Sequence, residues 1–211
     1  MAVLVAPHAR GMGPATCEEP DETTWIWSDL HLGNEMSLEV FDRPFRRVHE
    51  AEREMMTAWR DVVDIDDTIV CLGDIGVDGS VDETKAAQWS DAPGIKWLVI
   101  GNHDVDPLNP LNALVIDRTD ATLAAPGNPS LVLTHVPLRR VPAGWVNVHG
   151  HIHQERSPTD ERHINVSVEQ LDYRPARMSD IRRLARRLVK GTSVPGETTR
   201  VRLDLVEHAM T

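Results

Sequence analysis

The sequence is poor in cysteine and in long apolar runs, and each shortage excludes a class of protein. It has only two cysteines, Cys17 and Cys71, of which Cys71 stands in the apolar run TIVCLGD and Cys17 in a polar segment. We therefore expect no structural disulfide, which fits a reducing compartment. No apolar run approaches the roughly 18 residues that a membrane-spanning helix needs. The start, MAVLVAPHAR, has no basic region before its apolar residues, as a signal peptide would. We expect a cytoplasmic protein without a membrane segment.

Positive charge is also scarce. The 22 Lys and Arg residues face 33 Asp and Glu residues, a formal net charge of −11. An acidic chain repels phosphate backbones, so the balance argues against a nucleic-acid partner, although a local metal site could still attract a small anion. Aromatic residues make up only 4%, and six of them are Trp, which we expect to anchor the packing.

The length of 211 residues and the apolar content of 41% suit one domain with a full hydrophobic core. We expect a single domain over residues 1–211. Residues 1–23 read as a loop-like N-terminal extension, and residues 192–211 as a C-terminal strand or tail, with 198–207 as a final edge strand.

Strand-like and helix-like segments alternate in the first half of the chain, and the second half is richer in short strands. Apolar, β-branched runs predict strands at 23–29, 67–74 and 95–104, and within ATLAA, SLVLTH, GWVNVHG and HINVSVE. Helical spacing of apolar residues predicts helices at 44–63, 82–90 and 179–190, the last capped by Ser179 with a solvated arginine face. The alternation predicts an α/β fold with polar residues at the strand ends, where sites are built.

Five of these segments end in side chains that can bind metal: SDLH, LGDI, IGNHD, LTHVP and HGHIH. Asp29 and His31 are two residues apart at a strand end, so both side chains are expected on one side, where they could hold one divalent ion. His151 and His153 repeat this spacing. The candidate metal ligands are Asp29, His31, Asp74, Asn102, His135, His151 and His153. Carboxylates, an amide and imidazoles together suit two ions of Mn, Fe, Zn, Ni or Co better than Ca or Mg.

Each motif alone has a simpler explanation. A lone Asp-x-His or Gly-Asp is usually a turn, and the stretch VNVHGHIHQ could hold metal ligands, a proton relay or a polar surface strand. The occurrence of all five motifs in order, each after an apolar run, favours a metal centre. His149 has no place in that ligand set, and we interpret it as structural. His49, His163 and His208 have no evident partners and are expected at the surface.

The series DLH, GD, GNHD, TH and GHIH resembles the calcineurin-like metallophosphoesterase superfamily over residues 24–175. The segment NVSVEQLDYRP (165–175) resembles the closing segment of small, compact bacterial and phage-type members. The resemblance implies a four-layer α/β/β/α sandwich of two mixed β-sheets flanked by helices, with a dinuclear centre at the strand ends. It implies one metal on Asp29, His31 and His153 and another on Asn102, His135 and His151. Asp74 would bridge the two.

We therefore expect a metal-dependent phosphoesterase that hydrolyses a small phosphodiester or phosphomonoester, nucleotides and cyclic nucleotides included. Two metals about 3.5–4 Å apart can hold a hydroxide at neutral pH, and a bridging hydroxide would attack phosphorus in line. His103 is the candidate for assisting the leaving group, and Asp104 could hold its ring. Asn34 and Arg43 are candidates for contacting the substrate, with a turn and a surface position as the alternatives.

Two other functions remain open. A nuclease of the same superfamily would need a basic surface, against which the net charge of −11 argues. A non-catalytic scaffold that keeps the fold would be expected to lack a ligand or the histidine of GNHD, whereas here every expected position is filled.

Overall fold

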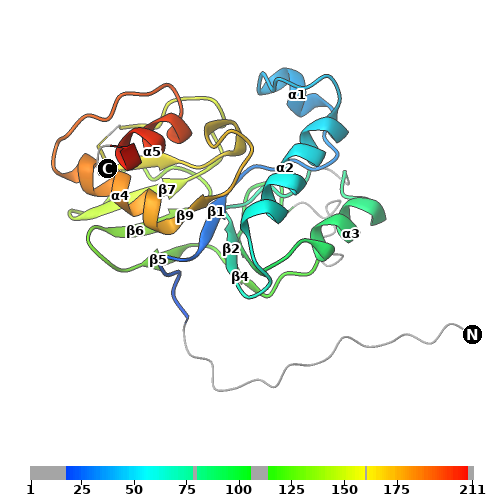
Figure 1. Cartoon of the computed structure of the whole chain (residues 1–211), viewed down its shortest axis with the longest axis horizontal. Coiled ribbons are helices and arrows are strands. Elements are labelled where there is room, and N and C mark those ends of the chain that lie inside the picture. Colours follow the sequence, from blue (N-terminus) through cyan, green and yellow to red (C-terminus); the bar gives the residue numbers. More distant parts are fainter. Residues whose placement is uncertain (1–17, 78–79, 106–113, 160, 209–211) are drawn as a thin grey trace, which may run out of the picture.

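The structure is a computed structural model, and it describes residues 18–77, 80–105, 114–159 and 161–208. Cys17 and the first part of the expected N-terminal extension lie outside these ranges. Residues 18–23 contain no helix or strand, as predicted. The described chain forms two mixed β-sheets flanked by helices, with α2 and α3 on one side of the strands and α4 and α5 on the other (Figure 1).

The first sheet has five strands. Their order is β4 (Arg118–Asp120), β3 (Ile95–Val99), β2 (Thr68–Cys71), β1 (Trp25–Trp27) and β9 (Ala176–Arg177). The first four run parallel, and β9 pairs antiparallel with β1. The loops after β1, β2 and β3 therefore leave the sheet at one edge.

The second sheet has four strands. Their order is β5 (Leu123–Ala125), β6 (Ser130–Thr134), β7 (Trp145–His149) and β8 (His163–Asn165). β6, β7 and β8 are parallel and β5 is antiparallel. A bridge between Ser28 and Ser167 links the segments that follow β1 and β8, so the carboxyl ends of the two sheets meet.

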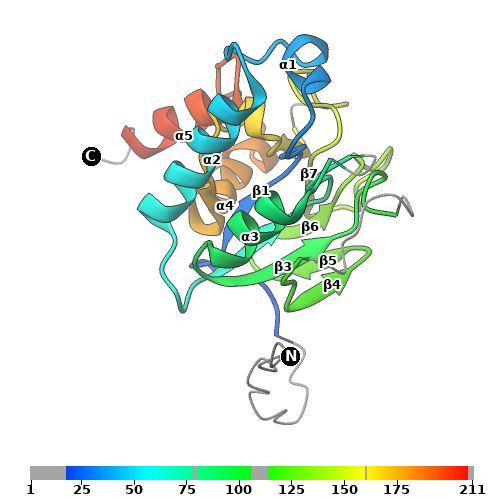
Figure 2. The same ribbon diagram turned by 90° about the vertical axis from the view of Figure 1, so that its right-hand side faces the viewer.

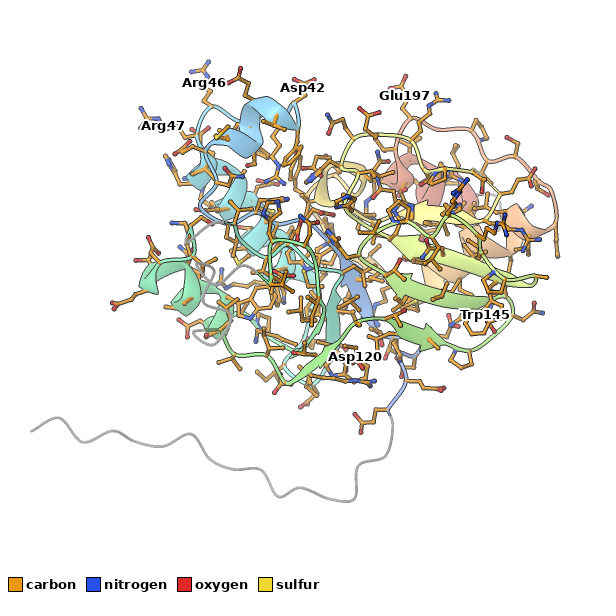
Figure 3. All side chains as sticks on the ribbon, turned by 180° about the vertical axis from the view of Figure 1, so that it is seen from behind. Asp42, Arg46, Arg47, Asp120, Trp145 and Glu197 are labelled. Carbon is orange, nitrogen blue, oxygen red and sulfur yellow. The ribbon has the colours of Figure 1, made fainter. Side chains whose placement is uncertain are left out.

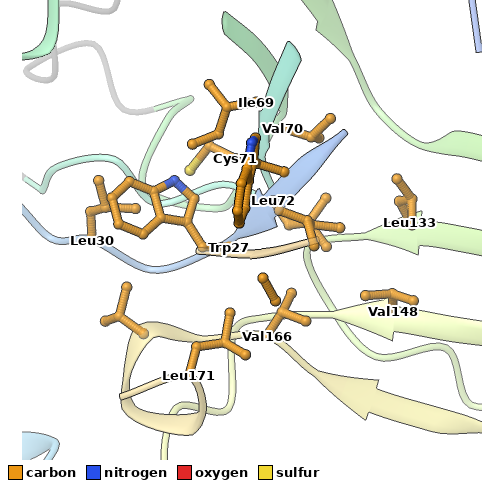
Figure 4. Packing of buried hydrophobic residues seen from close by; sticks show 14 of the residues in the cluster. Trp27, Leu30, Ile69, Val70, Cys71, Leu72, Leu133, Val148, Val166 and Leu171 are labelled. Atoms are coloured by element: carbon orange, nitrogen blue, oxygen red, sulfur yellow. The ribbon is translucent and has the colours of Figure 1, made fainter. Parts of the chain in front are cut away.

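The helices are α1 (Met36–Val40), α2 (Val48–Val62), α3 (Glu83–Asp91), α4 (Met178–Val189) and α5 (Thr199–His208). Figure 2 views the sheets from the side of α2 and α3. As expected, tryptophans anchor this face: the Trp59 ring stands edge-on to Trp27 of β1 at 5.2 Å and to Trp89 of α3 at 5.1 Å. Side chains from both sheets, among them Trp27, Leu72, Leu133 and Val148, fill one core (Figure 4).

The C-terminal segment corrects one prediction. Residues 198–207 were expected as an edge strand, but α5 runs through them. Thr199, Leu203 and Val206 are its buried residues, at helical spacing, and they are buried because α5 packs on α4. The alternating apolar pattern fits both structures, and this packing decides between them.

The predicted solvent exposure of the α4 arginines and of His163 is also partly wrong. Arg182 is almost fully buried; its guanidinium donates to Pro129 O at 2.6 Å and pairs with Glu22. His163 is buried between Thr159 Oγ1 at 2.9 Å and Leu138 O at 2.7 Å. The residue that caps α4 is Arg177, because the helix begins one residue before Ser179.

Other surface predictions hold. His49 and His208 are exposed. Among the described helices, none is both long and apolar enough to cross a membrane.

Candidate metal centre

The predicted ligands gather in the loops that follow the strands. Backbone hydrogen bonds tie these loops in pairs. Asp29 N donates to Gly73 O at 3.0 Å and His31 N to Asp74 O at 3.1 Å. Across the second sheet, Gly150 N donates to His135 O at 2.9 Å. His151 N also donates to Asp29 Oδ2 at 2.9 Å, so loops of the two sheets that are 122 residues apart are held at one edge.

The ligand-bearing loops have an unusual backbone. Five predicted ligands have left-handed φ angles: Asp29 (63°), His31 (50°), Asp74 (55°), His151 (71°) and His153 (47°). Such angles are uncommon for residues with a Cβ and concentrate at functional sites. The donor atoms of Asp29 and His31 do converge, but through left-handed turns beyond β1 rather than through the alternation of a strand. His151 and His153, in the turns beyond β7, belong to different donor groups.

Asp74 lies between two groups of donor atoms. Its Oδ2 is 3.8 Å from His31 Nε2 and 3.3 Å from His135 Nε2. On one side, donor atoms of Asp29, His31 and His153 lie within 4.8 Å of one another; on the other, those of Asp74, His135 and His151 do so. A carboxylate with two oxygens in this position could contact both groups.

The second group is the more closely spaced. His135 Nε2 is 2.9 Å from Asn102 Oδ1 and 3.2 Å from His151 Nδ1. Ligands bonded to one ion at about 2.0–2.2 Å are separated by comparable distances. The geometry therefore suits a single ion bound by these three side chains and Asp74.

His31 gives separate support for metal binding at this place. The residue is 1% exposed, and neither ring nitrogen has a hydrogen-bond partner among the described residues. A buried imidazole without a partner is costly, and an ion bound to it would remove that cost. The chain thus fits divalent metal at this place.

Two glycines let the loops approach one another. A Cβ at Gly150 would lie 2.1 Å from Ser28 Oγ and 2.4 Å from Asp29 Oδ2, and one at Gly101 would lie 2.2 Å from Asp74 Oδ1. No side chain fits at these distances. Glycine at both positions is therefore required by the close packing around the two carboxylates.

Burial and neighbouring charges shift the pKa values of the predicted ligands in different directions. Burial raises the pKa of Asp29 and lowers the pKa of His31 well below its usual value. Burial would raise the pKa of Asp74, but its hydrogen bond with His135 and the attraction of that ring lower it overall. Burial likewise opposes the charge on His135, yet Asp74 and Asp29 raise its pKa to about 9. His31 is thus held neutral, the state in which an imidazole binds metal.

His103 lies beside Asp74, the carboxylate predicted to bridge the two ions. Its backbone N–H donates to Asp74 Oδ1 at 3.0 Å, and its ring centre is 5.4 Å from that of His31. The residue is half-buried. This places the imidazole next to the predicted ligands and partly open to solvent.

Asp104 was expected to hold the His103 ring, but the hydrogen bonds of its carboxylate go to backbone N–H groups. Its carboxylate accepts the backbone N–H groups of Asp74, Ile75 and Gly101 at 2.8, 3.2 and 2.8 Å. Three such bonds tie together the two loops that present Asp74 and Asn102. The side chain therefore shapes the site through the backbone.

The two expected substrate contacts are both engaged elsewhere. Arg43 was expected beside the substrate or at the surface, but its side chain is fully buried against Glu169. Asn34 Oδ1 accepts the N–H of Met36 at 3.1 Å, at the start of α1, which is the alternative turn role.

The sequence patterns did not indicate the side chains that support the ligands. Ser167 Oγ lies 2.8 Å from Asp29 Oδ2, and Glu169 Oε1 lies 3.2 Å from His153 Nδ1. His149 is buried, as the structural interpretation required, and contacts Ser157 Oγ at 3.0 Å. Ser167 and Glu169 stand in the segment 165–175, where the resemblance was the only signal.

Comparison with known proteins finds related sequences and one related structure. No family model matches the chain. The Gene 66 protein of Mycobacterium phage L5 is 40% identical over 82 residues, which are 38% of this chain and 39% of that protein. The Gene 66 protein of Mycobacterium phage D29 is 29% identical over 178 residues, which are 69% of this chain and 87% of that protein.

The chain is also similar to a solved structure. The chain is similar to a protein of unknown function from Aquifex aeolicus, AQ665, whose crystal structure superposes with a TM-score of 0.63 at 24% identity. The match covers 76% of this chain and 98% of that one. This likeness supports the α/β fold and says nothing of the activity.

Proposed function

We propose that the protein is a metal-dependent phosphoesterase with a dinuclear centre at the meeting edge of its two sheets. The fold would then be a four-layer metallophosphoesterase-like sandwich. The observation that carries the proposal is the gathering of six donor side chains from four loops around Asp74, which lies in a fifth. The left-handed backbone at five of these seven residues, and the unpartnered ring of His31, support it.

The proposed division follows the distances. Asp29, His31 and His153 would hold one ion, and Asn102, His135 and His151 the other, with Asp74 shared between them. Manganese, iron, zinc, nickel and cobalt suit these oxygen and nitrogen donors. Two such ions supply Lewis acidity toward phosphoryl oxygens and a water of lowered pKa.

The exposure of the ligands defines the side from which a substrate would approach. Asp29, His31, Asp74, His135 and His153 are buried. Asn102 is exposed, and His103 and His151 are half-buried. A small phosphoester would therefore enter over Asn102, His103 and His151.

His103 is the proposed proton donor. Its backbone is fixed to Asp74, so its ring is held on the open side of the centre. There the imidazole could give a proton to the leaving oxygen while the phosphoryl group is bound, a role that typically contributes about 10²–10⁴-fold to the rate.

The test is a substrate panel with metal-free protein. Aryl phosphomonoesters, aryl phosphodiesters, cyclic nucleotides and duplex DNA are each assayed with Mn, Zn, Fe, Ni, Co or Mg added. The proposal expects hydrolysis of a small phosphoester that requires added metal. Cleavage of DNA that weakens steeply as salt rises would indicate the nuclease instead, and the absence of hydrolysis with every metal would indicate a scaffold.

A further inference from the structure

A buried ion pair lies directly behind one half of the centre. Arg43 Nη2 is 2.7 Å from Glu169 Oε1, and the two side chains are 0% and 5% exposed. The neighbouring Arg46 and Arg47 point outward from the connection between α1 and α2 (Figure 3). Burying a charged pair is expensive, so its presence beside the ligands calls for a reason.

Arg43 holds the backbone that carries two ligands. Nη2 donates to Asp29 O at 2.8 Å and Nη1 to Leu30 O at 3.0 Å, while Nε donates to Glu169 Oε1 at 2.8 Å. One planar guanidinium thus joins the left-handed turn from Asp29 to His31 to Glu169, which lies 126 positions after Arg43 in the chain. Lysine has no comparable fork of donors.

Glu169 in turn fixes the ring of His153. Its Oε1 lies 3.2 Å from His153 Nδ1, and the opposite ring nitrogen, Nε2, lies 3.9 Å from Asp29 Oδ1. The Glu169 carboxylate accepts the hydrogen bond of Nδ1–H, so Nε2 keeps its lone pair and faces Asp29. A carboxylate behind a ligating imidazole fixes its tautomer and orientation and raises its basicity.

The other half of the centre is supported differently. His135 Nδ1 donates to a backbone carbonyl, Leu72 O, at 2.7 Å. The other proposed ligands of this second half, Asn102 and His151, are neutral side chains. The first half, by contrast, contains the carboxylate of Asp29. The two halves therefore share Asp74 but differ in charge and in support.

We propose that Glu169, held by Arg43, is a positioning residue for the metal site of Asp29, His31 and His153, and that it makes this site the tighter of the two. The inference rests on the proposed function, because it requires that these residues bind metal. The tighter site fills first as metal is added, and its affinity depends on Glu169.

The test is a titration of metal-free protein with Mn²⁺ against a chromophoric chelator, with Co²⁺ spectra as a second readout. Wild-type protein is expected to bind two ions with separate affinities. Glu169→Met should weaken the tighter site by about 10–100-fold and leave the weaker one within a few-fold. Glu169→Gln should lose less of the tighter site's metal affinity, because its amide oxygen can still accept the hydrogen bond from His153 Nδ1.

Matched controls separate this effect from a general disturbance. Glu155→Gln changes an exposed glutamate two residues after His153, and Arg46→Lys changes an exposed arginine; both should titrate as wild type. Thermal melts in chelator report whether each variant folds. If Glu169→Met does not fold, Arg43→Lys decides, since it should also weaken only the tighter site.

Two results would overturn the inference in distinguishable ways. Folded Glu169→Met or Arg43→Lys protein that binds both ions within twofold of wild type would refute the positioning role and leave the metal centre standing. Wild-type protein that binds no ion would refute the proposed function and this inference together.

Discussion

Substitution of Gly150 by alanine perturbs the site at its closest packing. The added Cβ would lie 2.1 Å from Ser28 Oγ and 2.4 Å from Asp29 Oδ2. Neither neighbour can move freely. Ser28 Oγ donates to Leu72 O at 2.7 Å, and Asp29 Oδ2 accepts from His151 N at 2.9 Å and Ser167 Oγ at 2.8 Å. Both residues are 0% exposed.

The magnitude follows from these contacts. Overpacking of a buried position costs about 1–3 kcal/mol of folding free energy. For a chain of this size, each kcal/mol lowers Tm by about 2–4 °C. The displaced Asp29 should also lose its place among the ligands, and a shift near 1 Å at a catalytic site can lower turnover by about 10²-fold.

Gly144→Ala is the matched control. Nothing lies within 4 Å of a Cβ at Gly144, but its φ of +80° is left-handed. This variant should lose about 1–2 kcal/mol of stability through backbone strain alone and keep its turnover. Thermal melts, metal content and phosphodiester hydrolysis of both variants complete the assay. Wild-type metal content and turnover in Gly150→Ala would refute the packing argument.

Three further predictions address other parts of the molecule. Asp74→Asn should weaken both ions together, because its carboxylate lies beside both groups of donors; loss of one ion alone, measured by elemental analysis, would contradict the bridging role. His103→Ala should keep both ions and lose about 10²–10⁴-fold in kcat; an unchanged kcat would show that the leaving group needs no such donor. Trp59→Ala should lose about 3–5 kcal/mol in chemical denaturation, because the ring is buried between two other tryptophans; a loss below 1 kcal/mol would mean that α2 contributes little to the core.

The gathering of the candidate ligands could be predicted from the sequence because each follows an apolar run that forms a strand, and parallel strands bring such positions to one edge. The backbone conformation that presents these side chains could not be predicted. The residues Asp29 and His31 converge through left-handed turns, and the sequence pattern does not distinguish these from a continued strand.

Pairs of charged side chains that are distant in the chain could not be predicted from the sequence either. Arg43 looked like a surface residue before a helix, and its partner Glu169 stands 126 positions away. Arg182 likewise looked like one of several solvated arginines, but in the fold it contacts Ala125 of β5, Pro129 and Glu22. Burial of a charge depends on which distant segment covers it, and local composition does not carry that information.

The most direct test of the account is an anomalous difference map from crystals grown with Mn²⁺. The account predicts two peaks, one on each side of the Asp74 carboxylate, within bonding distance of Asp29, His31 and His153 and of Asn102, His135 and His151. A map with no peak at Asp74, or with manganese bound only elsewhere on the chain, would contradict it.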